Sequence, residues 1–247
     1  MAGHSKFKNI QFRKGAQDKK RAKLFAKISK EITVAAKLGL PDPSANPRLR
    51  SAIASGRAQN MPKDNIERAV KKSYDENAEN YEEVRYEGFG IEGVGIIVES
   101  LTDNRNRTAG DIRSIFSKHG GNLGETGSVS FMFNHLGIIK FSLEAGSFED
   151  IFEIATDAGA LDCDATDDGY EIFCSTDDLH QVTEIIEGSI KIPITSQLSW
   201  RPTNQIPLDK EKALKVLDMI DVLDDHDDVQ EVFANFDLPE EIFNEMS

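Results

Sequence analysis

The sequence that decides the fold lies between Gly137 and Trp200, where strand-like and helix-like segments alternate in a recognisable order. The segments are GIIKFSL (137–143), FEDIFEIATDA (148–158), LDCDAT (161–166), YEIFCS (170–175), DLHQVTEIIEG (178–188) and IPITSQLSW (192–200). Apolar, β-branched and aromatic residues predict strands in the first, third, fourth and sixth, whereas the second and fifth have the apolar spacing of helices. The order is therefore βαββαβ, which is typical of the split βαβ, or ferredoxin-like, arrangement.

Strand and helix patterns also flank this unit on both sides. Before it, Val94–Leu101 predicts a strand, Arg105–His119 a helix and Ser128–Phe133 a strand; after it, Asp209–Leu223 predicts a helix and Val229–Phe236 a strand. The first set supplies only βαβ, so the late αβ pair would complete it. We therefore expect a second domain of similar type, made from two chain segments, with the βαββαβ unit inserted in it.

The N-terminal part of the chain has helical periodicity. From Asp18 to Leu38 the apolar residues recur every three or four positions, and lysines fall on the opposite face. Asn46-Pro47 has the residues of a helix cap and first turn, and Asn60-Met61-Pro62 ends that helix and opens a third, which runs to Lys72. This pattern predicts a small three-helix module with a basic surface.

The predicted fold class is α+β, with an N-terminal helical bundle followed by two ferredoxin-like α/β domains, one inserted in the other. We assign the chain as a flexible basic tail (1–17), a basic three-helix module (18–72), a discontinuous α/β domain (84–134 plus 204–247) and an inserted βαββαβ domain (135–203). Residues 73–83 are polar and mostly acidic, which predicts a linker.

Charge is distributed unevenly along the 247 residues. Met1–Lys72 contains 18 Lys and Arg against 5 Asp and Glu, so its net charge is +13. The rest of the chain contains 11 basic and 38 acidic residues, a net charge of −27, and the whole chain carries −14. A basic module on an acidic body suggests that a polyanion is held at one end of the molecule and repelled by the other.

Two glycine-rich stretches have competing interpretations. Gly88–Gly93 fits GxGxxG, but it precedes a strand instead of following one, so we interpret it as a lead-in to that strand and not as a dinucleotide site. Gly120–Gly127 follows a helix and lacks the GK[ST] of a phosphate-binding loop. It is either a helix end with a tight turn, or a nucleic-acid contact made by exposed backbone N–H groups; Gly120 and Gly121 are the candidates.

Arg105 and Arg107 stand at a strand-to-helix junction in the acidic part of the chain. They either pair with nearby acidic residues or contact phosphate, and arginine is suited to both roles.

No catalytic motif is present. The five histidines are scattered, HExxH, CxxC and GxSxG are absent, and Cys163 and Cys174 have no zinc-ligand cluster around them. We expect the cysteines to be small buried residues on neighbouring strands. The chain has no long apolar run and no secretory signal at its start. We expect a monomeric cytoplasmic protein without enzymatic activity, with no cofactor, no metal, no small-molecule substrate and no membrane partner.

The tail gives the strongest functional signal, because cations alternate there with phenylalanines that have no local core. Bases can stack on such rings while the cations meet phosphates, although Phe7 and Phe12 could instead pack on the helical module. The predicted contacts with nucleic acid are His4, Lys6, Phe7, Lys8, Arg13, Lys14, Lys20, Lys23, Lys27, Lys30, Arg105, Arg107, Gly120 and Gly121.

Several motifs resemble those of the YebC/PmpR family. They are MAGHSK (1–6), RKGAQD (13–18), NMPKDNIE (60–67), the polar cluster 102–108 and GGNLGETGSVSFMF (120–133). The resemblance covers nearly the whole chain and implies a three-domain bacterial protein, a probable transcriptional regulator that binds DNA. It also implies mitochondrial relatives that act in translation, and a ribosome-associated role in elongation through proline-rich sequences. The chain departs from the family at Phe7, where Trp is common, and at Gln11-Phe12, where a basic pair is common.

Three hypotheses follow. The first is a regulator that binds DNA through the basic helical module. The second is a translation factor that contacts ribosomal RNA; the sequence shows no dimer interface and no recognition-helix signature, which favours this hypothesis slightly. In the third, the basic module neutralises the protein's own acidic domains, which predicts contacts of Lys23 or Lys27 with the acidic part.

Overall fold

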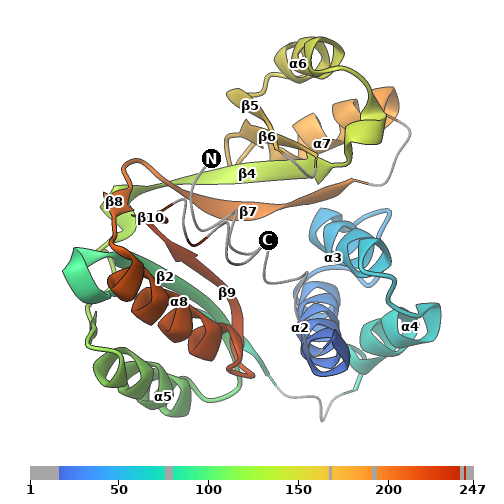
Figure 1. Cartoon of the computed structure of the whole chain (residues 1–247). Helices are drawn as coiled ribbons and strands as arrows, with labels where there is room; N and C mark the ends of the chain where they lie inside the picture. Colours follow the sequence, from blue (N-terminus) through green and yellow to red (C-terminus); the bar gives the residue numbers. More distant parts are fainter. Residues whose placement is uncertain (1–16, 76–79, 167–168, 191–193, 240–241, 243–247) are drawn as a thin grey trace. The chain divides into compact units, whose positions relative to one another are not determined.

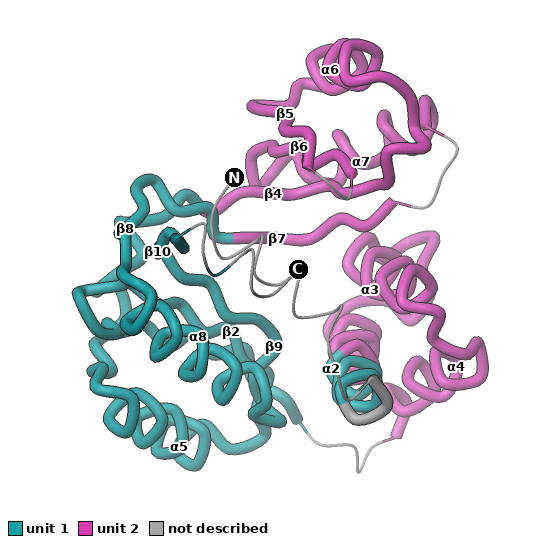
Figure 2. Tube along the Cα trace, in the orientation of Figure 1, with its two compact units in different colours: residues 1–27, 79–134, 200–247 teal, residues 28–78, 135–199 magenta. Residues whose placement is uncertain are grey.

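The structure is a computed structural model that describes residues 17–75, 80–166, 169–190, 194–239 and 242. The predicted tail lies almost wholly outside these residues. The chain is a mixed α+β protein with antiparallel four-stranded sheets, as expected (Figure 1). By internal contacts it divides into two compact units, coloured separately in Figure 2: Met1–Lys27, Glu79–Asn134 and Trp200–Ser247 form the first unit, and Ile28–Ala78 and His135–Ser199 form the second.

Three helices make up the N-terminal part: α2 (Gln17–Leu38), α3 (Pro47–Ala58) and α4 (Lys63–Lys72). Asn46 caps α3, because its side-chain oxygen accepts from the Leu49 N–H at 3.1 Å. The Asn46 side-chain NH₂ also donates to the Ala35 carbonyl at 2.8 Å, which ties the start of α3 to the end of α2. Ile32, Leu49, Ile53, Met61 and Ile66 are among the buried residues of these helices. The predicted three-helix pattern and its boundaries are confirmed.

The first sheet has the strand order β3-β1-β2-β9, and it is built from two distant segments of the chain. Its strands are β1 (Glu82–Phe89), β2 (Gly95–Thr102), β3 (Asn122–Leu123) and β9 (Val229–Ala234). Helices α5 (Arg105–Lys118) and α8 (Lys210–Asp224) lie on one face of it (Figure 1). Phe116 of α5 and Ile220 of α8 are fully buried there with Val98 of β2. Short strands β8 (Ile206–Pro207) and β10 (Phe236–Asp237) pair in parallel nearby in this unit.

Two predictions about this sheet are wrong. Residues 82–83 were assigned to a linker and Gly88 to a strand lead-in, but both belong to β1, which forms a hairpin with β2. The charged residues of β1 obscure the apolar alternation by which a strand is recognised in a sequence, although Val84 and Tyr86 face the core. Gly88 is required by packing, because a Cβ there would lie 2.5 Å from the Phe116 ring.

Ser128–Phe133 is not a strand. Ser130–Met132 forms a short 3-10 helix and Phe133 begins the next strand, β4. The element order of the first sheet is therefore ββαβ followed later by αβ, in place of the βαβ that we expected. The domain boundaries assigned from the sequence stay a prediction.

The second sheet has the strand order β5-β6-β4-β7. Its elements are β4 (Phe133–Phe141), α6 (Phe148–Asp157), β5 (Asp162–Ala165), β6 (Tyr170–Cys174), α7 (Leu179–Ser189) and β7 (Thr195–Pro202), in the βαββαβ order that the sequence predicted. Its core includes Ile139, Ile151, Ile172 and Ile186, each fully buried.

The two cysteines are buried and free on neighbouring strands of this sheet, as expected. Burial, with smaller contributions from nearby aspartates, raises the pKa of each thiol to about 11.

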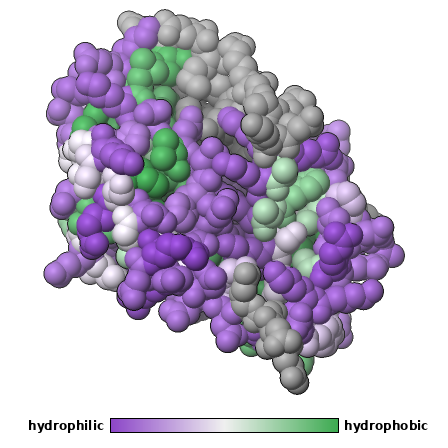
Figure 3. All heavy atoms as spheres, turned by 90° about the horizontal axis from the view of Figure 1, so that it is seen from below, coloured by the Kyte–Doolittle hydropathy of each residue, from purple (hydrophilic) through white to green (hydrophobic). Residues whose placement is uncertain are grey.

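Exposed side chains of the described residues are mostly hydrophilic in the view of Figure 3, with separate hydrophobic patches between them. Phe131 and Tyr74 are the aromatic side chains with the largest exposed fractions, 74% and 65%, among the described residues. No helix in the described ranges is long and apolar enough to cross a membrane.

Candidate nucleic-acid interface

The tail contacts predicted from the sequence lie outside the described residues: His4, Lys6, Phe7, Lys8, Arg13 and Lys14. The candidate contact residues within the described part of the chain lie on α2, on the α3–α4 pair and in two loops of the first sheet, and each of these regions is described by itself.

The lysines of α2 meet the acidic end of α8 within the first unit. Lys23 Nζ lies 3.0 Å from Asp225 Oδ2 and donates to the Asp225 carbonyl at 3.1 Å. Lys27 Nζ lies 3.7 Å from Asp224 Oδ1. These are the contacts that the third hypothesis predicted for Lys23 and Lys27. Lys30, farther along the same helix, is half-buried.

Lys20 is exposed at the same face of α2 and lowers the pKa of Asp221. Burial is the larger effect, and with the neighbouring carboxylates of α8 it raises the pKa of Asp221 overall. Neighbouring carboxylates thus disfavour the ionised form of Asp221, and Lys20 of α2 offsets part of that effect.

The ion pair between Lys23 and Asp225 is weak enough for another anion to replace it. The Lys23 and Asp225 side chains are 42% and 66% exposed, and exposed pairs contribute about 0.2–1 kcal/mol each. A phosphate backbone that approached α2 would compete with α8 for the same ammonium groups.

Helices α3 and α4 are joined by a turn of four residues, Gln59–Pro62. Asn60 adopts a left-handed φ of 56°, and the Met61 N–H donates to the Gly56 carbonyl at 2.9 Å, which closes the turn. Two helices joined by such a turn are the arrangement of helix-turn-helix proteins, in which the second helix contacts the major groove.

Helix α4 buries one face and exposes a polar, largely basic one. Ile66 and Ala69 are buried and Asn65 is half-buried, whereas Arg68 and Lys71 are exposed. The exposed face therefore offers cations, with a partly accessible amide side chain near the start of the helix, where base edges are contacted in helix-turn-helix proteins.

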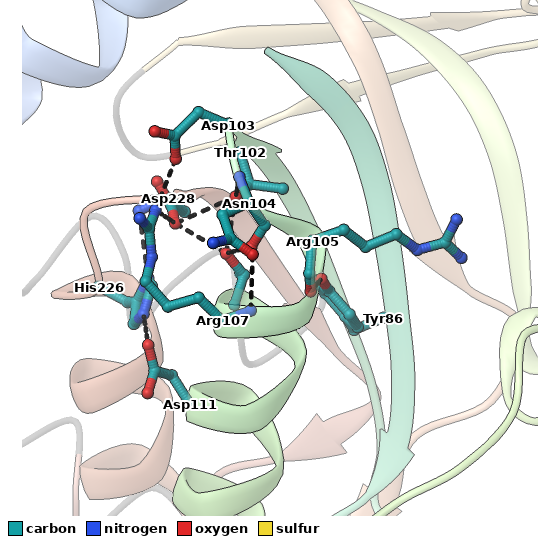
Figure 4. A network of polar contacts seen from close by, with 10 residues as sticks. Tyr86, Thr102, Asp103, Asn104, Arg105, Arg107, Asp111, His226 and Asp228 are labelled. Carbon is teal, nitrogen blue, oxygen red and sulfur yellow. Dashed lines mark hydrogen bonds and ion pairs between the residues drawn. The ribbon is translucent and has the colours of Figure 1, made fainter. Parts of the chain in front are cut away.

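Arg107 belongs to a network at the start of α5 (Figure 4). One guanidinium nitrogen, Nη2, lies 2.7 Å from Asp103 Oδ1 and 2.9 Å from Asp228 Oδ2. Asp228 is buried and also accepts from Thr108 Oγ1 at 2.7 Å. Asn104 caps α5 by accepting from the Arg107 N–H at 3.1 Å. The hydrogen bonds to Asp228 and Asp103 raise the pKa of Arg107, so its charge is committed to this junction.

Arg105 has a different place. Its carbonyl accepts from the Tyr86 hydroxyl at 3.2 Å, but its guanidinium points away from the network in Figure 4. Arg107 therefore pairs with acidic residues, which is one of the two roles considered for these arginines. The Arg105 guanidinium is directed away from those acidic residues, as a contact with phosphate requires.

Gly120 and Gly121 form the turn after α5. Gly120 has φ 75°, and the Gly121 N–H donates to the Phe116 carbonyl at 2.8 Å. A Cβ at Gly121 would lie 2.6 Å from the Phe89 carbonyl oxygen, so β1 leaves room for glycine alone. The helix-end interpretation accounts for both glycines; their contact with nucleic acid stays a prediction.

Glu87 of β1 holds the rest of this loop from inside. The side chain is 1% exposed and accepts from the backbone N–H groups of Val129 and Ser130, each at 2.9 Å. Its carbonyl accepts from the Gly124 N–H at 2.8 Å, and Arg85 Nε lies 3.1 Å from its carboxylate. Burial alone would raise the pKa of Glu87, but the backbone hydrogen bonds and Arg85 outweigh it and lower the pKa. These N–H groups are therefore engaged within the protein.

The described residues contain no group of three or more His, Cys, Asp and Glu side chains arranged to hold a metal ion. Sequence reasoning missed Glu87, because one glutamate in a charged stretch carries no distinguishing signal. It also missed the exposed face of α4. The helix boundary at Asn60-Met61-Pro62 and the basic residues that follow it in the sequence could have indicated this face.

Comparison with known proteins identifies the family to which the chain belongs. The model for the TACO1/YebC protein N-terminal domain matches residues 5–76, and the model for the TACO1/YebC second and third domain matches residues 81–236. The chain therefore belongs to the TACO1/YebC family. It is also similar to a conserved hypothetical protein from Aquifex aeolicus, whose crystal structure has a TM-score of 0.82. That protein is 43% identical, and the match covers 90% of this chain and 92% of that one.

Proposed function

We propose that this protein is a non-enzymatic regulator that binds nucleic acid through its N-terminal helices, with DNA as its target and transcription as the regulated process. The observation that carries the proposal is the exposed basic face of α4, which follows α3 after a four-residue turn. The acidic remainder of the chain supports it, because its net charge of −27 disfavours contact between that part of the chain and a polyanion. We propose that the protein acts in the cytoplasm as a monomer.

In this mechanism α4 lies in the major groove. Arg68 is suited to the O6 and N7 acceptors of guanine, and Asn65 to the edge of adenine. Lys20 and Lys23 of α2 contact backbone phosphates once they leave the acidic end of α8. The phosphate contacts supply affinity and the α4 contacts supply selectivity.

The test is duplex binding by fluorescence anisotropy across about 50–200 mM salt. Arg68→Ala is compared with Arg113→Ala, which removes an exposed arginine from α5 in the acidic part of the chain. Arg68→Ala should weaken binding and relax sequence preference, while Arg113→Ala should do neither. Equal binding of promoter and random duplexes by the wild type, at physiological salt, would refute transcriptional control.

A second candidate is a ribosome-associated translation factor that contacts ribosomal RNA and aids elongation through proline-rich sequences. It is favoured by the alternation of cations and phenylalanines in the tail, because bases stack on such rings. Co-sedimentation of the full chain with ribosomes under weak-binding conditions tests it. Loss of co-sedimentation on changing Phe7 to Ala would support it, and absence of the wild type from the ribosomal fraction would count against it.

A further inference from the structure

A groove with a volume of about 520 Å³ lies on the helical segment, and all of its lining belongs to the second unit. The lining residues come from α3, from the turn after it, from α4 and from the segments beside these elements. The volume is in the range of sites that enclose a small ligand or one part of a larger one.

The floor of the groove is apolar and its mouth is aromatic. Ile53, Met61 and Ile66 are 5–7% exposed and form a fixed hydrophobic base. Tyr74 stands at the edge with 65% of its surface exposed, and its backbone N–H donates to the Lys71 carbonyl at 3.1 Å. That bond fixes the backbone of Tyr74 against the last turn of α4, and the residue lines the groove while most of its surface stays exposed.

The rim carries positive charge. Arg57, Lys63 and Lys71 line the groove together with one acidic residue, Glu67. Lys63 Nζ lies 3.5 Å from the Glu67 carboxylate, so these two charges offset each other. The charges of Arg57 and Lys71 are then in excess, and the groove is complementary to a ligand that is flat and apolar in one part and anionic in another.

We infer that this groove receives one unpaired base of a single-stranded nucleic acid. The base lies on the apolar floor and stacks on the Tyr74 ring, while Arg57 and Lys71 contact the flanking phosphates. Single-strand sites combine these elements, an aromatic platform and a cationic path for the backbone. A base within a duplex is stacked between its neighbours and does not reach such a groove, so the site distinguishes single strands from duplexes.

The inference rests on the proposed function, since it requires that the helical segment meets nucleic acid. An acidic amphipathic peptide would match the apolar floor and the cations as well, but it makes no specific use of an exposed ring beside the groove. The ring therefore favours the base.

The experiment measures binding of full-length protein to a labelled single strand of about 12 nucleotides, as DNA and as RNA, and to the matching duplex. Tyr74→Ala removes the platform, and Tyr74→Phe retains it as the matched control. We expect Tyr74→Ala to weaken single-strand binding about tenfold and to leave duplex binding unchanged, with Tyr74→Phe close to wild type. Because Tyr74 is exposed, circular dichroism should show both variants folded.

Photocrosslinking provides an independent readout. A 4-thiouridine-substituted strand should crosslink to the segment that contains Tyr74. Wild-type binding that Tyr74→Ala leaves unchanged, or crosslinks confined to the sheets, would overturn the inference while the proposed function stands. If Tyr74→Ala weakens binding of an acidic amphipathic probe peptide but not of the strand, the groove is a peptide site and the inference is wrong. Failure of the wild type to bind either strand or duplex would refute the proposed function itself.

Discussion

Removing the carboxylate of Glu87 should destabilise the first unit, and the size of the effect follows from its contacts. Glu87 is buried on β1 and accepts two backbone hydrogen bonds, from Val129 and Ser130, at 2.9 Å each. Val129 is fully buried beside this carboxylate, so its N–H has no access to water when the acceptor is removed. The perturbations are Glu87→Gln, which keeps a neutral acceptor, and Glu87→Ala, which keeps none.

Hydrogen bonds to a charged group contribute about 1.5–3 kcal/mol each, and neutral ones about 0.5–1.5 kcal/mol. Glu87→Gln exchanges two bonds of the first kind for two of the second, which lowers the free energy of unfolding by about 2 kcal/mol. Glu87→Ala leaves the buried Val129 N–H and the part-buried Ser130 N–H without an acceptor; a buried donor without an acceptor costs about 1–3 kcal/mol and a part-buried one less, so we expect a loss of about 3 kcal/mol.

The assay is urea unfolding followed by the fluorescence of Trp200, the single tryptophan of the chain. Trp200 packs in a hydrophobic cluster with Val129, and the Arg85 guanidinium lies 4.8 Å from the centre of its ring. Its emission therefore reports on the region that Glu87 holds together. Glu82→Gln, at the exposed start of β1, is the matched control and should change the free energy of unfolding by less than about 0.5 kcal/mol.

The pH dependence has a definite sign. The folded-state pKa of Glu87 is below its ordinary value of 4.5, so its stabilising contribution is full above that value. The contribution is lost as the pH falls through the lowered pKa, and Glu87→Gln should flatten this part of the profile. A change of less than about 0.5 kcal/mol for Glu87→Ala would show that these hydrogen bonds do not stabilise the first unit, because the buried Val129 N–H alone should cost more than that without an acceptor.

Three further predictions concern separate parts of the chain. Arg105→Ala should lower the salt slope of nucleic-acid binding by about 0.9 without changing thermal stability, whereas Arg107→Ala should lower the melting temperature and leave the slope unchanged; the reverse pattern would exchange their roles. Asp225→Lys should increase nucleic-acid affinity at low salt, measured by anisotropy, because the acidic end of α8 then no longer competes for the α2 lysines; unchanged affinity would remove the competition argument. Cys163 and Cys174 should react slowly with a thiol reagent near pH 8 in the native protein and rapidly in denaturant, because burial raises both pKa values to about 11; fast native labelling would contradict their burial.

Much of the fold was predictable where local pattern and tertiary packing agree. The three helices follow from apolar spacing and from the caps at Asn46-Pro47 and Pro62, and the βαββαβ order of the second sheet follows from alternating segment types. Strand β1 was not predictable in this way, because a run of charged residues suppresses the alternation that marks a strand. Its strand character is supplied by pairing with β2 along its whole length.

Ser128–Phe133 shows the opposite error. The segment alternates polar and apolar residues, as a strand does. In the structure the N–H groups of Val129 and Ser130 donate to the Glu87 carboxylate, some forty positions earlier, and Ser130–Met132 forms a 3-10 helix. No local pattern contains that information. The same holds for Arg107, whose partner Asp228 is distant in sequence, and for the groove beside Tyr74, which exists only once α3 and α4 pack.

Binding of nucleic acid by the N-terminal helices is tested by crosslinking in cells, with sequencing of the DNA and the RNA recovered with the wild type and with Arg68→Ala. We expect nucleic acid to be enriched with the wild type and reduced with Arg68→Ala, with promoter DNA above ribosomal RNA for a transcriptional regulator. Recovery of ribosomal RNA clustered near one functional centre would instead support the second candidate function, a translation factor. Recovery of neither above the level of an uncrosslinked control would contradict nucleic-acid binding by the N-terminal helices.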